Sequence, residues 1–199
     1  KTAVGARVDL LYEALDNRHT APLVRDADFD FGAGAGGEYG IGVGELAGDG
    51  FSPTFLRNGT VYGLSPRMRF DTVLNDLVAS AVTTGTIVLY SDGTPWRPVV
   101  HVEDVARSFL HVAEAPIEAV HGQAFNNGSD NLNYRIIQLA EMVAETVPGC
   151  QIEVRGETSA DQRTYQADFN KFARTFPDFE FKWSPRLGAA ELYQAFKDV

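Results

Sequence analysis

The sequence has a single cysteine, few basic residues and no long apolar run. Cys150 is the only thiol, so no internal disulfide can form. Such sparse use of cysteine is typical of a reducing compartment. We find no stretch of 18 or more apolar residues, which is the length that a membrane-spanning helix needs. We therefore expect a cytoplasmic protein that does not span a membrane.

Acidic residues outnumber basic residues, and this charge balance limits which ligands and macromolecules the protein can bind. There are 17 lysines and arginines against 27 aspartates and glutamates, for a net charge of -10. A nucleic-acid-binding protein needs a basic face, so we expect no nucleic-acid partner. An anionic small molecule stays compatible with this balance. A few arginines in a cleft can hold a diphosphate by direct, bidentate contact on a protein that is acidic overall.

The first 50 residues give no regular pattern apart from one amphipathic stretch at Val8–Leu15. Nine glycines fall between Gly32 and Gly50, a density that raises the entropy cost of ordering the backbone. Residues 32–37 spell G-x-G-x-x-G, but the residues before them make a poor buried strand and those after them a poor helix. We expect a flexible loop, with a dinucleotide-phosphate turn as the alternative. The chain begins at Lys1, so a fragment of a longer protein is one interpretation left open.

From Phe51 onward, short apolar runs alternate with amphipathic stretches. The alternation predicts an α/β fold. The predicted strands are 53–57, 87–90, 99–102, 124–126 and 152–154. The predicted helices are 70–84 ending at Gly85, 103–113, 133–147 with Asn133 as cap, 168–176 with Asp168 as cap, and 189–196.

Three segments of this second part carry a specific pattern. Residues 57–63 read R-N-G-T-V-Y-G, residues 97–106 read R-P-V-V-H-V-E-D-V-A, and residues 161–168 read D-Q-R-T-Y-Q-A-D. Their order and spacing resemble the NAD-dependent epimerase/dehydratase family, the sugar-nucleotide branch of the extended short-chain dehydrogenases. The resemblance covers about residues 51–199. It implies the C-terminal half of such a protein, with a remnant of a Rossmann-like sheet and a substrate-binding subdomain.

The resemblance also implies ligands and the residues that bind them. The ligands would be a nucleoside-diphosphate sugar and NAD or NADP, and family members often form homodimers. Arg97 and Arg163 stand where the family contacts the substrate diphosphate, and a guanidinium suits two phosphate oxygens at once. Weaker sugar or nucleotide contacts are expected from Asn58, Thr60 and Asn75. The segment that passes the nicotinamide contains Gly59 and Val61.

Other polar residues of these segments are expected to serve the fold. His101 is predicted to end a strand, and Asp104 to sit at the positive end of a helix. For Asn75 an exposed position on its helix is the alternative to a nucleotide contact, and for Arg163 a surface or core-pairing role is the alternative. We expect no metal site.

Two features of the family are not found ahead of residue 57. The Tyr-x-x-x-Lys pair does not occur there, since the fourth residue after Tyr39 is Val43 and the fourth after Tyr12 is Asp16. Fifty residues also cannot hold a dinucleotide-binding half. We therefore predict a truncated or degenerate nucleotide-binding region at 1–50 and a substrate-binding α/β region at 51–199. Two functions stay open: part of an epimerase or dehydratase, acting as an isomerase or lyase, or a non-catalytic sugar-nucleotide-binding homologue.

Overall fold

The computed structural model describes Gly48, residues 51–157 and residues 163–197, and the chain divides into two compact units. One unit comprises residues 1–57 and 107–125, and the other comprises residues 58–106 and 126–199. The predicted helix at 8–15 and the glycine tract lie outside the described residues, apart from Gly48. The boundary near residue 50 therefore remains a prediction.

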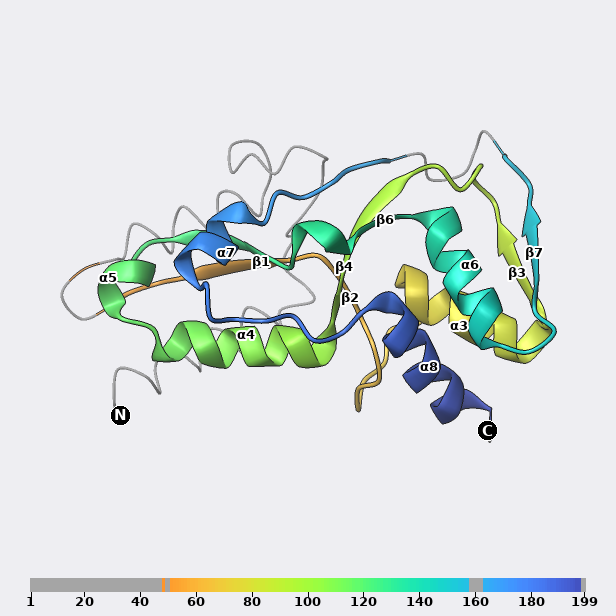
Figure 1. Ribbon diagram of the computed structural model, residues 1–199, viewed down its shortest axis with the longest axis horizontal. Helices are drawn as coiled ribbons and strands as arrows, with labels where there is room; N and C mark the ends of the chain where they lie inside the picture. Colours follow the sequence, from red (N-terminus) through yellow and green to blue (C-terminus); the bar gives the residue numbers. More distant parts are fainter. Residues whose placement is uncertain (1–47, 49–50, 158–162, 198–199) are drawn as a thin grey trace. The chain divides into compact units, whose positions relative to one another are not determined.

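The described elements alternate between strands and helices, so the predicted α/β class is confirmed (Figure 1). The strands are β1 Phe55–Asn58, β2 Thr60–Tyr62, β3 Thr86–Leu89, β4 Trp96–His101, β5 Ala124–Asn127, β6 Asn133–Arg135 and β7 Gln151–Val154. The helices are α3 Val73–Thr84, α4 Val102–Glu114, α5 Ile117–Val120, α6 Ile136–Thr146, α7 Asn170–Thr175 and α8 Pro185–Phe196, with a 3-10 turn η1 at Asp130–Leu132.

Strand pairing in the second unit is mainly parallel. Strand β4 is central, with β2 parallel on one side and β6 antiparallel on the other. Strands β3 and β7 form a separate parallel pair, and β1 pairs with β5. Parallel pairs need long crossover connections, which here contain α3 and α6. This arrangement places the carboxyl ends of β2 and β4, at Tyr62 and His101, next to each other.

Helices α3, α6 and α8 build the main core of the second unit, and Figure 1 shows them grouped beside the β3–β7 pair. Helix α3 presents Leu74, Leu77, Val78 and Ala81 to this core. The helix ends at Gly85, which adopts a left-handed φ of 70°. A residue without Cβ takes that conformation at little cost.

The starts of helices α3, α6 and α7 differ from the predictions. Asn133 does not cap α6, because residues 133–135 pair with β4 as strand β6 and the helix begins at Ile136. The Gln138 side chain accepts from the Arg135 N–H instead, at 2.9 Å. Asp168 lies one residue before the helix N-cap, and its carboxylate accepts from the Asn170 N–H at 2.7 Å. Helix α3 begins three residues later than predicted, at Val73.

Helix α8 begins four residues earlier than predicted, and its cap gives a first prediction. Ser184 accepts a hydrogen bond from the Leu187 N–H at 3.3 Å, and Pro185 follows it. Ser184→Ala should lower the free energy of unfolding by about 1 kcal/mol, since it removes this acceptor. Urea unfolding monitored by circular dichroism measures the loss. Ser184→Asp keeps an acceptor and should stay near wild type, so an equal loss in both variants would contradict the cap.

Candidate functional site

Arg97 lies on the central strand β4, and its side chain is held by neighbouring backbone. The guanidinium donates to the Trp96 carbonyl at 2.8 Å and also to the Arg163 carbonyl. It lies over the ring of Tyr165, 5.2 Å from the ring centroid, at a distance that allows a cation–π interaction. The structure therefore brings Arg97 against the second predicted diphosphate residue, through the main chain of Arg163.

The segment 163–169 runs along β4 and η1 without forming a regular strand. The Trp96 N–H donates to Thr164 Oγ1 at 2.9 Å, and the Tyr165 N–H donates to the Trp96 carbonyl at 3.3 Å. Farther along, the Asn133 amide exchanges two hydrogen bonds with the backbone of Ala167. Arg163 itself is exposed at the start of this segment. These bonds fix the backbone that carries it beside Arg97.

The predicted residues Asn58, Gly59, Thr60 and Val61 follow one another from the end of β1 into β2. The Asn127 side-chain N–H donates to Asn58 Oδ1 at 2.8 Å. A Cβ at Gly59 would lie 3.2 Å from the backbone of Pro98, so this position allows β2 to approach β4 closely. Thr60 and Val61 pair in register with Val99 and Val100. These residues are thus half-buried along one edge of β4, and none of the observed contacts assigns them a ligand.

Asn75 is buried in helix α3, with 3% of its surface exposed. The alternative of an exposed helical asparagine is therefore wrong. Its Oδ1 accepts from the Gly63 N–H at 3.0 Å, and its Nδ2 donates to the Arg69 carbonyl at 2.9 Å. The amide thus fastens both ends of the loop that joins β2 to α3. Its contact with a nucleotide stays a prediction.

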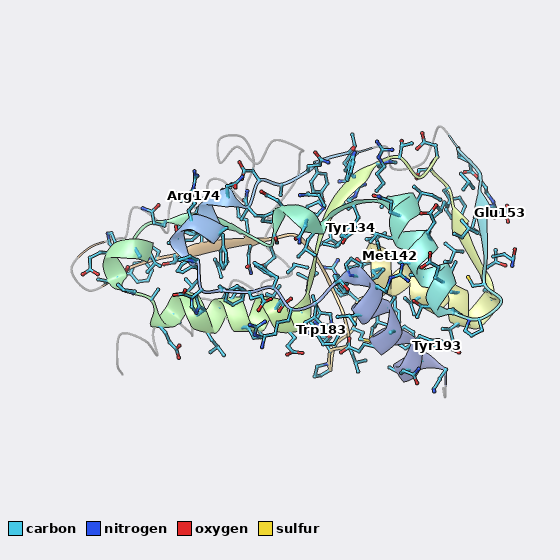
Figure 2. The ribbon with its side chains drawn as sticks, in the orientation of Figure 1. Tyr134, Met142, Glu153, Arg174, Trp183 and Tyr193 are labelled. Carbon is cyan, nitrogen blue, oxygen red and sulfur yellow. The ribbon has the colours of Figure 1, made fainter. Side chains whose placement is uncertain are left out.

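The structure adds a cluster at the end of β2 that the motifs did not reveal. His101 is 1% exposed and stacks on Trp183, with ring centroids 3.8 Å apart and planes 11° apart. Figure 2 labels Trp183 on the segment that leads into α8. Glu191 of α8 lies 3.0 Å from His101 Nε2 and accepts from the Leu64 N–H at 3.0 Å. No sequence signal marked Glu191, since an acidic residue on a C-terminal helix is ordinary.

Two further residues frame this cluster. The Tyr62 ring contacts His101 edge-on, with centroids 5.3 Å apart, and burial raises the pKa of its phenol, with the Asp104 carboxylate adding to the effect. Asp104 is fully buried and accepts from the backbone N–H groups of Lys182 and Trp183 at 3.1 and 2.9 Å. The predictions that His101 ends a strand and that Asp104 lies at the positive end of a helix are confirmed, since β4 ends at His101 and Asp104 lies in the first turn of α4.

A polar groove of about 490 Å³ lies in the second unit, on the side of β4 that carries Trp96. Its lining residues are Trp96, Asp130, Asn133, Gln166, Ala167, Asp168 and Asn170. The Arg135 guanidinium covers one face of the Trp96 ring, 5.1 Å from the centroid. None of the predicted site residues is in this lining set. Its two carboxylates make it a poor match for a diphosphate.

The described part of the chain contains no metal-binding cluster and no membrane-spanning helix. No group of three or more histidines, cysteines, aspartates or glutamates in this part of the chain is placed to hold a metal ion. No helix there is both long and apolar enough to cross a membrane. Cys150 is half-buried, and burial raises the pKa of its thiol. A buried thiol with a raised pKa is a weak nucleophile.

Comparison with known proteins confirms the resemblance found in the sequence. Residues 45–128 match the NAD dependent epimerase/dehydratase family. UDP-glucuronic acid decarboxylase 2 from Arabidopsis thaliana is 29% identical over 135 residues, which are 66% of this chain and 29% of that protein. The chain thus spans less than a third of the length of the curated relatives that it matches.

Solved structures show the same fold. UDP-glucuronic acid 4-epimerase from Bacillus cereus, in complex with UDP-glucuronic acid and NAD, matches with a TM-score of 0.64 and 19% identity, over 82% of this chain and 50% of that one. dTDP-glucose 4,6-dehydratase from Bacillus anthracis, in complex with NAD, matches with a TM-score of 0.55 and 20% identity, over 72% of this chain and 44% of that one. The described residues therefore correspond to about half of such a protein, as expected for part of a Rossmann-like fold.

Proposed function

Since residues 45–128 match the NAD-dependent epimerase/dehydratase family, we propose that this chain is the sugar-nucleotide-binding part of such an enzyme. The observation that carries the proposal is the meeting of Arg97 with the backbone of Arg163, 66 residues later. Both stand in segments that resemble the family's diphosphate contacts. In this proposal both guanidinium groups face the diphosphate, since two such groups are suited to an anion with several oxygens.

The proposal assigns a role to each predicted residue. Arg97 and Arg163 hold the diphosphate of a nucleoside-diphosphate sugar, while Asn58, Thr60 and Asn75 contact the sugar or nucleotide. Gly59 and Val61 pass beside the nicotinamide of NAD or NADP. UDP-glucuronic acid and NAD are bound together by the Bacillus cereus epimerase, and this supports the same ligand classes here.

Among the described residues, the proposal places only the segment at β2 beside NAD or NADP. Bound nicotinamide supplies a hydride acceptor for oxidation of a sugar carbon. A Cβ at Gly59, which directly precedes β2, would lie 3.2 Å from the Pro98 backbone, so this glycine allows the start of β2 to approach β4 closely. The region ahead of residue 57 offers neither the glycine fingerprint in a strand–helix setting nor a Tyr-x-x-x-Lys pair, and that spacing occurs only at Tyr193 and Lys197, after the substrate segments. We therefore assign to this chain the binding and orientation of the sugar nucleotide and derive no redox step from it.

The proposal also assigns a separate role to each of two regions of the chain. Residues 51–199 form the substrate-binding region, and residues 1–50 are a truncated or degenerate nucleotide-binding region. A cytoplasmic location and a homodimer belong to the same proposal and rest on the single cysteine and on the family resemblance.

A non-catalytic sugar-nucleotide-binding protein is the second candidate. The lack of a Tyr-x-x-x-Lys pair ahead of residue 57 favours it, because that pair supplies the general acid or base of the family's chemistry. Calorimetric titration of the 199-residue chain with NAD and with a UDP-sugar separates the two candidates in part. Binding of the sugar nucleotide without NAD is the result expected of this chain by itself. Tight NAD binding would overturn the assignment and return the phosphate role to residues 32–37.

The arginines provide the direct test of the proposed site. Arg97→Ala and Arg163→Ala should each weaken sugar-nucleotide binding about tenfold or more, since each removes charge-assisted hydrogen bonds worth about 1.5–3 kcal/mol. Arg97→Lys should recover only part of the affinity, because a point charge cannot replace the planar fork. Calorimetry with UDP- and dTDP-sugars measures the change.

The matched control is Arg186→Ala, which removes an exposed arginine that pairs with Glu145. It should leave the affinity unchanged. Because Arg97 also binds backbone carbonyls, thermal unfolding of each variant must accompany the titration. Unchanged affinity in both Arg97→Ala and Arg163→Ala would refute the diphosphate role.

A further inference from the structure

The loop that follows β2 is held at two consecutive backbone N–H groups by side chains from two different helices. The Gly63 N–H donates to Asn75 Oδ1 of α3, and the Leu64 N–H donates to Glu191 Oε2 of α8, each at 3.0 Å. Leu64 and Glu191 are 127 residues apart in the chain. Loops usually leave such groups to water, so two side-chain acceptors on adjacent amides fix the path of this one.

The His101 ring packs directly against the backbone of the same loop. A Cβ at Gly63 would lie 2.3 Å from His101 Nε2, so the loop backbone rests directly on the imidazole. Gly63 also has a φ of +112°, a conformation that favours glycine. The loop and the ring are therefore in contact with no side chain between them.

The hydrogen bonds of His101 define its tautomer. The Glu103 N–H donates to Nδ1 at 3.2 Å, so Nδ1 is the acceptor nitrogen. Nε2 then carries the proton and donates to Glu191 Oε2 at 3.0 Å. Stacking on Trp183 fixes the plane of the ring, and the Trp183 indole N–H donates to Glu103 Oε2 at 3.1 Å. Such an orienting pair of hydrogen bonds decides which nitrogen of a histidine donates.

Glu191 joins these two contacts at one atom. Its Oε2 accepts from both Leu64 N–H and His101 Nε2–H, while its side chain keeps 26% of its surface exposed. A carboxylate that accepts from two donors in a largely desolvated place makes charge-assisted bonds, which are stronger than neutral ones. Helix α8 thereby ties the loop to the buried histidine.

We propose that Glu191 is a positioning residue, which sets the geometry of the Tyr62–Leu64 loop and of the Thr60 and Val61 positions before it. The proposal rests on the proposed function, in which this segment borders the sugar and the nicotinamide. His101, with its Nε2–H tautomer, is the partner through which Glu191 acts. Neither side chain is assigned a contact with the ligand.

The first experiment tests the loop without any ligand. In Glu191→Ala, hydrogen exchange at the Leu64 amide should accelerate about tenfold to a hundredfold, because the amide loses a charged acceptor. Glu191→Gln keeps a neutral oxygen and should recover most of the protection. The 15N shifts of the His101 ring should report the Nε2–H form in the wild type and a mixture of tautomers in Glu191→Ala. Glu145→Gln, which removes the Arg186 ion pair of α8, should change neither measurement.

A role limited to packing α8 would give a different pattern, with exchange accelerated together in α3, α6 and α8. That pattern, or an unchanged Leu64 amide in Glu191→Ala, would overturn the proposal. Local acceleration with rescue by glutamine supports it.

The second experiment adds UDP-glucuronic acid to the same variants and measures affinity by calorimetry. Weaker binding by Glu191→Ala, with wild-type affinity in Glu145→Gln, supports the positioning role. Equal affinity in wild type and Glu191→Ala overturns it. If the wild-type chain binds no sugar nucleotide, the proposed function fails and the positioning role fails with it, whereas the exchange data still report whether Glu191 holds the loop.

Discussion

Replacing Asp104 with alanine is expected to lower the free energy of unfolding by about 3 kcal/mol or more. The fully buried carboxylate accepts from two consecutive backbone N–H groups, those of Lys182 and Trp183. Alanine would leave both part-buried donors without this acceptor, and each such loss costs about 1–3 kcal/mol. The segment that leads into α8 would then keep only the hydrogen bond from Trp183 to Glu103 among these links to the start of α4.

Denaturant unfolding followed by tryptophan fluorescence measures this loss, since Trp183 reports on the same place. Asp178→Ala is the matched control, because Asp178 is exposed, and a surface substitution of this kind should change stability by less than about 0.5 kcal/mol. Asp104→Asn should be intermediate, as its amide offers one acceptor where the carboxylate offers two. A loss in Asp104→Ala no greater than in the control would show that the two backbone bonds contribute nothing.

Gly63→Ala is the second substitution with a large expected effect, again about 3 kcal/mol or more. Its φ of +112° disfavours any residue with a Cβ, and the new methyl group would overlap His101 Nε2 at 2.3 Å. Backbone strain of this kind costs about 1–3 kcal/mol, and forcing a methyl group into a packed core costs a similar amount. Thermal unfolding of the variant measures the sum.

Gly85→Ala separates the two contributions. Gly85 also has a positive φ, of 70°, but nothing lies within 4 Å of its missing Cβ. This control should lose only about 1 kcal/mol. If the clash with His101 is real, combining Gly63→Ala with His101→Ala should cost less than the sum of the two single substitutions. Equal losses for Gly63→Ala and Gly85→Ala would contradict the clash.

Elements with strong local signals were predictable from the sequence. Helix α3 carries Leu74, Leu77, Val78 and Ala81 on one face and ends at a glycine, and the structure has both features. Asn133 was misassigned because its local context suits a helix cap. Its actual role depends on pairing with Pro98 in β4 and on the Ala167 backbone, and neither is visible in a local window.

Some residues of the candidate site could likewise be predicted from the sequence, and others could not. The family resemblance implies the roles of Arg97 and Arg163, and the structure places the Arg97 side chain on the Arg163 backbone. The role of Glu191 could not be predicted from the sequence, because its partners Leu64 and His101 lie 127 and 90 residues earlier in the chain. The nucleotide contact of Asn75 stays a prediction, while the hydrogen bonds of its buried amide to Gly63 and Arg69 are visible only in the structure. Hydrogen bonds between distant segments decide such roles.

The attachment of the Tyr62–Leu64 loop to α8 also has a consequence for how the protein is made. Gly188 packs so closely on Tyr62 that a Cβ there would lie 2.3 Å from the phenol ring, and Glu191 binds the Leu64 amide. During synthesis, strand β2 leaves the ribosome more than 120 residues before these partners. At about 5–20 residues per second, the loop waits roughly 6–25 seconds for the helix that fixes it. Closure of this region is therefore a late event on the ribosome, and the Tyr62–Leu64 segment lacks its contacts with α8 until that helix emerges.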